Sequence, residues 1–388
     1  MDKMKFTIDS KDFKTAITKV LQLKDGILSS LQRVYITVNA EAGKAELLAT
    51  NIDEYIKVYI SDCYNLESGK AVIDRTDLKL LEKLKGELTI SDIDTEKLLV
   101  QTDKKKLKIN NYMWTDEFLD IPELKNLQKV LVTDEAWLLE TVTNLSKFTT
   151  TNDLNKLQQA FNFNIKDKQV EAVDGYKIGI RYFNNRVRTI DGAENLMLKN
   201  VCLPVFKKIL DFKSEAEVDF YQNKDYIKVS GTDFIYMVNA IEGAYFKIKP
   251  MIYTDYNYSI DINCKDILES VKYAEPMLKK EHSPLILHTE NENLYTYFIS
   301  SKCESLELIQ SENNTMSNDF YIGINPSYLV ECFTILHSIG ADAANCKFIT
   351  SKSPMEIEAD DYLFLVLPIN ITTNNGMMEN INELLIAG

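Results

Sequence analysis

The sequence predicts an α+β protein built from three tandem copies of one domain, each with two helices packed on antiparallel sheets. One order of elements occurs three times: strand, amphipathic helix, long hairpin, second helix and closing hairpin. The copies begin near residues 4, 129 and 257, and a length of 388 residues accommodates three domains of common size. We therefore predict domains at residues 1–126, 127–253 and 254–388.

Each copy opens with a strand that leads into an amphipathic helix. We expect the strands at residues 4–9, 129–134 and 257–262 and the helices at residues 9–24, 133–148 and 263–280. An Asp, Ser, Thr or Asn near each helix start can accept hydrogen bonds from the first backbone N–H groups. Apolar side chains recur at i, i+4 and i+7, namely at Phe13, Ile17 and Val20, at Leu138, Val142 and Leu145, and at Ile267, Val271 and Ala274. Each of these helices should therefore bury one face.

A second helix and a closing hairpin complete each copy. The second helices are expected at residues 74–85, 204–213 and 325–337, and two of them carry a proline in the first turn, where its missing N–H costs nothing. The hairpins that follow pair residues 87–91 with 97–110, 216–222 with 226–240, and 346–351 with 355–369. The links near residues 121–125 and 249–252 are not rich in Gly or Ser, which indicates that the domains are held rigidly.

Composition indicates a globular protein of the cytosol. The chain is 45% hydrophobic and 26% charged, no apolar run reaches the 18 residues that a membrane helix needs, and the start lacks a signal-peptide core. Six cysteines are far apart and form no CxxC pair, at positions Cys63, Cys202, Cys264, Cys303, Cys332 and Cys346. We expect reduced thiols, no zinc ribbon and no membrane contact.

The net charge of −14 argues at first against nucleic acid as a partner, because Lys and Arg must neutralise phosphates. Its distribution matters more than the total. The six predicted helical segments together carry +3, so the remaining chain carries −17. The helices thus hold the available positive surface, although lysine on an exposed helical face is also common as plain solvation.

Motifs of catalysis are missing from the sequence. The three histidines, His282, His288 and His337, show no metal-ligand spacing, and no GxSxG, Walker A or GxGxxG sequence occurs. We therefore predict no enzyme, no catalytic residue, no metal and no cofactor. Two alternatives stay open at this stage: an Asp-rich hydrolase, whose acids would leave no short motif, and an acidic scaffold or DNA mimic that binds proteins and never touches DNA.

Two stretches resemble a known family. Residues 172–178 read Ala-Val-Asp-Gly-Tyr-Lys-Ile, and residues 362–369 read Tyr-Leu-Phe-Leu-Val-Leu-Pro-Ile. They are similar to the T-D-G-H-R-L and Y-V-V-M-P-M stretches of the bacterial sliding clamp, the beta subunit of DNA polymerase III. Residues 49–53 echo the first stretch more weakly. The resemblance covers nearly the whole chain and indicates a divergent member.

The resemblance implies a head-to-tail homodimer whose six similar domains close a ring around double-stranded DNA, with helices lining the hole. Such a ring needs no base readout, only a mildly basic bore and an acidic exterior, and the charge distribution fits this independently. The candidate DNA-facing residues are Lys11, Lys14, Lys24, Lys79, Lys83, Lys147, Lys156, Lys207, Lys208 and Lys272.

The resemblance also implies a cleft between the middle and last domains that binds a short linear peptide with a hydrophobic end, carried by the replicative DNA polymerase and the clamp loader. The residues carried over to this site are Leu157, Val173, Gly175, Tyr176, Lys177, Ile178, Leu365, Leu367, Pro368 and Ile369. The chemistry is plausible in itself, because Gly175 permits close backbone approach and the apolar side chains can hold a Leu or Phe anchor. In the alternative interpretation Leu365, Leu367 and Ile369 are one face of a half-buried strand.

The chain departs from the family pattern at several positions. Tyr176 and Lys177 replace the usual His and Arg, Asn370 replaces an Arg, and residues 245–252 lack the expected Pro-Asp, so we expect a different peptide preference. The chain also continues beyond residue 371. We consider two possibilities for this tail: its leucines, Leu384 and Leu385, cover the peptide site, or it is a disordered or harmlessly packed end.

Ring closure implies an interface between two subunits. By resemblance, Leu107 and Ile109 of a first-domain edge strand should meet Met277 and Leu278 of the third domain of the other subunit. Two free strand edges that seal each other also avoid aggregation. Residues 104–106 are three lysines beside this strand, and they indicate either a nucleic-acid patch or protection of the edge.

Overall fold

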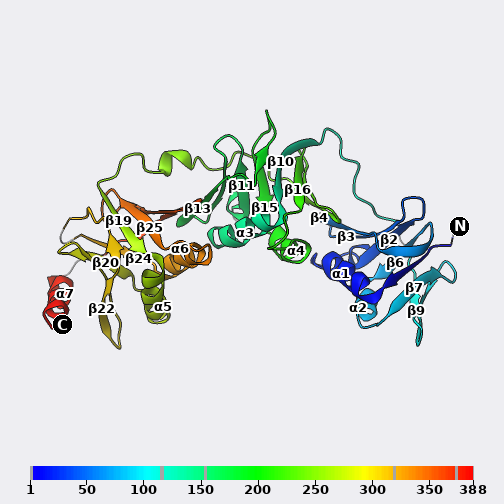
Figure 1. The fold of residues 1–388 in the computed structure, drawn as a ribbon, viewed down its shortest axis with the longest axis horizontal. Helices are drawn as coiled ribbons and strands as arrows, with labels where there is room; N and C mark the ends of the chain where they lie inside the picture. The colour runs from blue at the N-terminus through cyan, green and yellow to red at the C-terminus, as the bar shows by residue number, and fades with distance from the viewer. Residues whose placement is uncertain (1–2, 114–117, 153–154, 318–319, 372–374, 388) are drawn as a thin grey trace. The chain divides into compact units, whose positions relative to one another are not determined.

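The computed structural model describes residues 3–113, 118–152, 155–317, 320–371 and 375–387 (Figure 1). The chain forms two compact units. Unit 1 contains residues 1–142 and 185–242, and unit 2 contains residues 143–184 and 243–388. The middle third of the chain therefore contributes to both units.

Strand pairing explains this division. In unit 1, β18 (Phe234–Asn239) pairs antiparallel with β4 (Glu54–Ile60), so the middle third shares a sheet with the first third. In unit 2, β13 (Lys177–Tyr182) pairs antiparallel with β27 (Tyr362–Val366), which does the same with the last third. The boundaries predicted at residues 126 and 253 lie outside all strands.

Unit 1 is built from two antiparallel sheets. The smaller has the order β5-β1-β7-β8-β9, with β1 (Lys5–Asp9), β5 (Cys63–Glu67), β7 (Glu87–Asp92), β8 (Lys97–Gln101) and β9 (Lys106–Asn110). The larger has the order β14-β10-β16-β17-β18-β4-β3-β2-β6, with β2 (Arg33–Asn39), β3 (Lys44–Thr50), β6 (Gly69–Asp74), β10 (Gln128–Asp134), β14 (Arg188–Thr189), β16 (Glu217–Gln222) and β17 (Tyr226–Ser230). The short strand β15 (Leu196–Lys199) lies within the residue range of this unit but in neither of these two sheets.

The helices of unit 1 follow the predicted pattern. They are α1 (Ser10–Val20), α2 (Arg75–Leu81), α4 (Cys202–Ile209) and the 3-10 turn η1 (Ser29–Gln32), and α3 (Glu135–Leu145) begins in unit 1 and ends in unit 2. The Asp9 carboxylate accepts a hydrogen bond from the Lys11 N–H at the start of α1, and Phe13, Ile17 and Val20 are buried as predicted. α1 ends at Val20, earlier than the predicted residue 24, because the next residues form a turn.

Unit 2 also contains two antiparallel sheets. One runs in the order β15-β11-β12-β13-β27-β26-β25-β19-β23, with β11 (Ala160–Asn164), β12 (Gln169–Val173), β19 (Tyr258–Asn263), β23 (Ser311–Glu312), β25 (Ala343–Phe348) and β26 (Met355–Ala359). The other has the order β22-β21-β20-β24-β28, with β20 (Leu285–Glu290), β21 (Asn293–Ile299), β22 (Glu304–Ile309), β24 (Tyr321–Ile324) and β28 (Pro368–Ile369).

Three helices and three 3-10 turns complete unit 2. They are α5 (Cys264–Glu281), α6 (Pro326–Ser338), α7 (Asn375–Ala387), η2 (Ser146–Phe148), η3 (Lys156–Gln159) and η4 (Lys249–Met251). α5 and α6 pack together. Asn263 and Asn325 cap them with their side-chain oxygens, and Pro326 opens α6 as predicted. The mixture of helices and antiparallel sheets predicted from the sequence is confirmed.

The tail forms α7, which packs on a sheet. Ile381 is fully buried against Ile286 and Tyr297, and Leu384 and Leu385 pack at the rim of this cluster. The cluster contains none of the ten residues predicted for the peptide site. The two leucines thus pack on β20 and β21, as in the alternative of a packed tail, and Tyr321 and Ile371 of the same cluster also line a cavity with Pro368 and Ile369.

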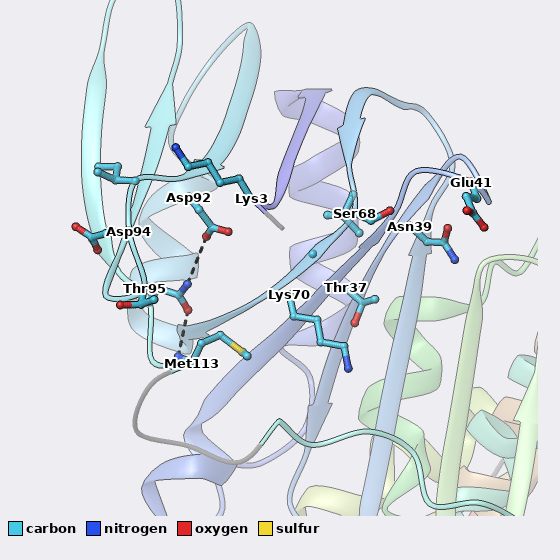
Figure 2. Close-up of a pocket in the computed structure, with 14 residues that line it drawn as sticks. Lys3, Thr37, Asn39, Glu41, Ser68, Lys70, Asp92, Asp94, Thr95 and Met113 are labelled. Atoms are coloured by element: carbon cyan, nitrogen blue, oxygen red, sulfur yellow. Dashed lines mark hydrogen bonds between the residues drawn. The ribbon is translucent and has the colours of Figure 1, made fainter. Parts of the chain in front are cut away.

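A cavity of about 740 Å³ in unit 1 lies where the chain start, the β2–β6 sheet and the β7–β8 turn meet (Figure 2). On one wall Asp92 accepts hydrogen bonds from the Met4 N–H (2.8 Å) and the Asn111 amide (3.4 Å). Burial raises the pKa of Asp92. The Asn111 oxygen accepts from the Val72 and Met113 N–H groups at 3.1 and 3.2 Å. None of the site residues predicted from the sequence lines this cavity.

The Asn111 side chain holds three segments of unit 1 together, and it is only 3% exposed. We expect Asn111→Ala to lower the free energy of unfolding by about 2 kcal/mol, because two backbone donors lose their buried acceptor. The thermal midpoint of unfolding measures the effect. Thr95→Ala, an exposed position that lines the same cavity, serves as the control. Equal midpoints for the two variants would contradict this role.

Candidate binding surfaces

The β13–β27 pairing aligns residues that are almost two hundred positions apart. Ile178 lies opposite Leu365, and Lys177 lies opposite Val366. Because side chains alternate along a strand, Ile178 and Leu365 share one face of the sheet, whereas Lys177 points to the other face. The pairing thus separates two neighbouring residues that the sequence assigned to one site.

The Ile178 face forms an apolar cluster. Val173, Ile248 and Leu365 are buried in it, and Ile178 is half-buried. Three side chains of one later segment also pack against it, namely Tyr245, Phe246 and Ile252. They belong to the stretch 245–252, for which the sequence indicated only the absence of the Pro-Asp that the family carries. Its apolar residues at 246, 248 and 252 were the available signal for a segment that packs against the cluster.

A tight turn at Gly175 connects this cluster to the exposed surface. The Asp174 carboxylate accepts hydrogen bonds from the N–H groups of Tyr176 (2.8 Å) and Lys177 (3.0 Å). Gly175 has φ +99°, a conformation that side chains rarely adopt, and a Cβ there would lie 3.1 Å from the Gln158 amide. The Tyr176 carbonyl accepts the Leu367 N–H at 3.0 Å, which fixes the turn against the segment after β27.

The exposed part of this surface consists of Tyr176 and Leu367, which are 63% and 42% exposed. The Tyr176 ring is stacked on Tyr328 of α6, with centroids 6.4 Å apart. Pro368 and Ile369 are half-buried and line a cavity of about 240 Å³. The sequence did not single out Tyr328, because α6 is distant along the chain and nothing in its pattern marks one tyrosine of the helix.

Leu157 lies in η3, where the Asn155 side chain accepts a hydrogen bond from its N–H. It is half-buried, and its neighbour Gln158 approaches the Gly175 turn. The alternative interpretation of one half-buried strand face fits Leu365 alone. Leu367 and Ile369 lie beyond the end of β27, in the connection to β28 and in β28 itself.

Lys177 is buried on the opposite face of β13, with 4% of its side chain exposed. Its Nζ atom lies 3.2 Å from the Asp174 carboxylate and donates hydrogen bonds to Glu331 and to the Lys147 carbonyl. It also lies 5.1 Å from the centre of the Tyr328 ring. The Lys177 side chain, predicted to contact a partner peptide, is thus buried instead and makes its contacts with Glu331 and Tyr328 of α6.

Two opposing effects act on the pKa of the buried Lys177 side chain. Burial lowers the pKa of Lys177, but the hydrogen bond and charge of Glu331, followed by those of Asp174, outweigh it and raise the pKa above the ordinary 10.5. Lys177 is thus protonated at neutral pH. Because Lys147 is a candidate DNA-facing residue, Lys177 also connects the turn at Gly175 to that candidate surface.

All ten lysines predicted to face DNA are exposed. Within the described part of the chain none of them forms an ion pair with a carboxylate. Lys11 and Lys14 lie on α1 and Lys207 and Lys208 on α4, and these two helices pack together in unit 1. The other positions lie on or just after helices and 3-10 turns, at Lys24, Lys79, Lys83, Lys147, Lys156 and Lys272.

Of the residues predicted for ring closure, Leu107 and Ile109 lie in the edge strand β9, and Met277 and Leu278 lie in α5. β9 ends the small sheet of unit 1, and β22 ends the second sheet of unit 2. Leu107 and Met277 are half-buried, so both can take part in an interface. Leu278 is fully buried in α5 and Ile109 is 6% exposed. For Leu278 the prediction needs correction, because its side chain belongs to the core of its own unit.

Two searches of the described residues bear on the other classes of function. No group of three or more His, Cys, Asp or Glu side chains is arranged to hold a metal ion there. Within the same ranges, no helix is long and apolar enough to cross a membrane.

Comparison with known proteins gives a consistent result. No protein-family model matches the chain. The beta sliding clamp of Buchnera aphidicola is 22% identical to it over 92% of this chain and 96% of that protein. A putative DNA polymerase III beta subunit from Eubacterium rectale superposes with a TM-score of 0.84 at 23% identity, over 95% of this chain and all of that one. The DNA polymerase sliding clamp of Bacillus subtilis gives 0.83 at 16% identity, with the same coverage.

These similarities extend over the whole chain rather than one unit. The fold is thus one that solved bacterial proteins share at low identity. The resemblance predicted from the sequence is confirmed: in sequence and in fold, the chain matches the bacterial beta sliding clamps, the beta subunits of DNA polymerase III.

Proposed function

We propose that the protein is a DNA sliding clamp, a processivity factor that encircles duplex DNA and tethers a polymerase. The observation that carries this function is the match to beta sliding clamps over 92% of the sequence and 95% of the fold. The alternative of an acidic scaffold or DNA mimic is not favoured, since the proteins that match nearly the whole chain are sliding clamps and DNA polymerase III beta subunits. The clamp acts in the cytoplasm by enclosure, without catalysis or a cofactor.

The ring consists of two chains with three domains each, at residues 1–126, 127–253 and 254–388. Support comes from the order strand, helix, helix and three closing strands, which occurs as β1-α1-α2-β7-β8-β9, as β10-α3-α4-β16-β17-β18 and as β19-α5-α6-β25-β26-β27. Closure joins β9 of one subunit to β22 of the other. The charges are complementary, because residues 104–106 and Lys108 are basic whereas Glu304 and Glu307 of β22 are exposed acids.

Ring closure is tested by the mass in solution. At micromolar concentration we expect a dimer of about 89 kDa, twice the chain mass of 44.5 kDa, in sedimentation equilibrium. Leu107→Asp should shift the population to monomer, because it places an unpaired charge in the seam. A wild-type protein that sediments as a monomer at all concentrations would contradict the ring.

DNA is held by topology, and the exposed lysines only keep the duplex centred. We expect each single Lys→Ala change to weaken binding to linear duplex by less than about threefold, because one phosphate contact is one of many. The combination of Lys11→Ala, Lys14→Ala, Lys207→Ala and Lys208→Ala should weaken binding by about tenfold or more. Fluorescence anisotropy at 50 mM salt measures both effects.

Four exposed lysines outside the candidate surface form the control: Lys125→Ala, Lys166→Ala, Lys224→Ala and Lys302→Ala. This variant changes the net charge by the same amount. A difference in DNA binding between the two fourfold variants therefore reports the position of the lysines and not the total charge. Equal losses in the two fourfold variants would mean that α1 and α4 do not face DNA.

The surface around Tyr176 and Leu367 binds the partner peptide. The hydrophobic end of the peptide inserts beside Leu367, Pro368 and Ile369. The buried cluster around Leu365 forms the floor of this binding site. The partners are the replicative polymerase and the clamp loader. Tyr176 in place of His, with its ring on Tyr328, narrows the entrance and favours a flat apolar anchor.

A further inference from the structure

The sheet that carries β22 has two different faces. On β21, the Thr296 hydroxyl lies 2.7 Å from that of Ser270, and the Phe298 ring lies 6.3 Å from Tyr273; both partners belong to α5. Tyr297 stands between them in sequence and therefore points away from α5. It packs instead against Ile381 of α7. The helix α7 thus covers the face of this sheet that is opposite to α5.

The helix α7 reaches β22, the edge strand of the sheet. Tyr297 lies opposite Ile286 of β20 and opposite Leu306 of β22, and all three belong to the cluster around Ile381. α7 contacts β22 itself, as Figure 1 shows at the end of the chain. Glu304 is on the same face as Leu306, and its carboxylate accepts a hydrogen bond from the Tyr297 hydroxyl. α7 therefore lies beside the position that the next strand of the sheet would occupy.

The outward side of α7 is acidic. Glu379 and Glu383 are exposed one turn apart, and residues 375–387 include no Lys or Arg. The C-terminal end of a helix adds partial negative charge from its free carbonyl groups. Ile386, one turn further, is 85% exposed. A strand that pairs with β22 would therefore lie next to the negative charges of α7.

The strand β9 presents the matching charge. Phe6, Ile90, Val100 and Leu107 lie opposite one another across the small sheet of unit 1, and Phe6 packs on Phe13 of α1. Leu107 therefore points to the helix side. Lys106 and Lys108 point to the other side and are exposed.

We infer that α7 is a clasp across the subunit seam, whose Glu379 and Glu383 pair with Lys106 and Lys108 of a second copy of this chain. The inference rests on the proposed ring, in which β9 of one subunit continues the sheet of β22 with the helices of both subunits on one side. In that arrangement Lys106, Lys108 and α7 all lie on one side of the joined sheet, and the helices α1 and α5 lie on the other side. The clasp adds the charges of α7 to the edge hydrogen bonds and the complementary charges that β9 and β22 bring to the seam.

Charge reversal tests the clasp. We expect the variant with Glu379→Lys and Glu383→Lys to raise the dimer dissociation constant about five- to tenfold at 50 mM salt, and less than twofold at 500 mM, because salt screens exposed pairs. Lys106→Glu with Lys108→Glu should act in the same way. All four changes together should restore dimerisation to within about twofold of the wild type. Sedimentation velocity over a dilution series measures the constants.

A matched control has Glu41→Lys and Glu242→Lys, two exposed acids outside α7 and β22. It changes the net charge equally, and since the chain carries −14, it should leave dimerisation unchanged or tighten it. A wild-type dimer whose α7 variant behaves like this control overturns the clasp and leaves the ring intact. Failure of the fourfold variant to recover also overturns it. A wild-type monomer would overturn the ring itself.

Discussion

Leu367→Asp should weaken the binding of a partner peptide by about thirtyfold or more, the effect of losing one interface hot spot. Leu367 is 42% exposed, and its N–H is held by the Tyr176 carbonyl, so the change alters the surface and leaves the backbone pairing in place. A charged side chain there would remain unpaired beneath an apolar anchor. A fluorescent nine-residue peptide that ends in Leu-Phe is the probe, and its anisotropy gives the dissociation constant.

Phe212→Asp is the control, because Phe212 is another exposed apolar side chain, 56% exposed, in unit 1. It should bind the peptide as the wild type does. If Leu367→Asp binds equally well, the surface between Tyr176 and Ile369 is not the peptide site. If both variants lose binding, the peptide recognises apolar surface in general.

Lys177→Met should destabilise unit 2 by about 2 kcal/mol, because it removes the cation between two partly buried carboxylates. The figure is below that for a fully buried pair, since the side chains of Asp174 and Glu331 are 16% and 30% exposed. The thermal midpoint should fall by about 4 to 8 °C at pH 7. The same variant should weaken peptide binding, because Tyr328 loses the cation that faces its ring.

The pH dependence has a defined sign. Glu331 and Asp174 raise the pKa of Lys177 in the folded protein despite its burial. The stabilisation is therefore fully present below the unfolded pKa of about 10.5, and it is lost as the pH rises through the higher folded pKa. The gap between wild type and Lys177→Met should be constant from pH 7 to 9 and narrow near pH 11.

Two further variants make this test specific. Lys249→Met removes an ion pair with Asp167 in which the lysine is 76% exposed, and it should change the midpoint very little. Adding Glu331→Gln to Lys177→Met should recover part of the loss, because one unpaired carboxylate is removed. A gap that persists unchanged at pH 11, or no loss at pH 7, would contradict the role assigned to Lys177.

Local patterns predicted the local structure well. The i, i+4, i+7 spacing of Phe13, Ile17 and Val20 fixes the buried face of α1, and proline in the first turn marks the start of α6. These signals depend on neighbours within two turns of helix. The grouping of middle-third strands with both flanking thirds depends instead on pairings such as β4 with β18, between residues about 180 positions apart.

The same distinction explains the candidate site. The sequence identified Gly175 and Leu367 through motifs, and the turn at φ +99° gives the glycine its physical reason. It could not show that Lys177 points away from Ile178, because this follows from the strand register with β27. Nor could it show that Tyr328 completes the surface, since the contact exists only once α6 packs beneath the Gly175 turn.

The central claim is that the protein holds DNA by enclosing it, and end-blocked DNA tests this most directly. The protein is mixed with a linear duplex biotinylated at both ends, the ends are capped with streptavidin, and the complex is passed through a gel-filtration column at 500 mM salt. Encirclement predicts that the dimer stays with the capped duplex, and that a restriction enzyme cutting between the ends releases it within minutes. Release from capped and cut DNA at the same rate would contradict encirclement.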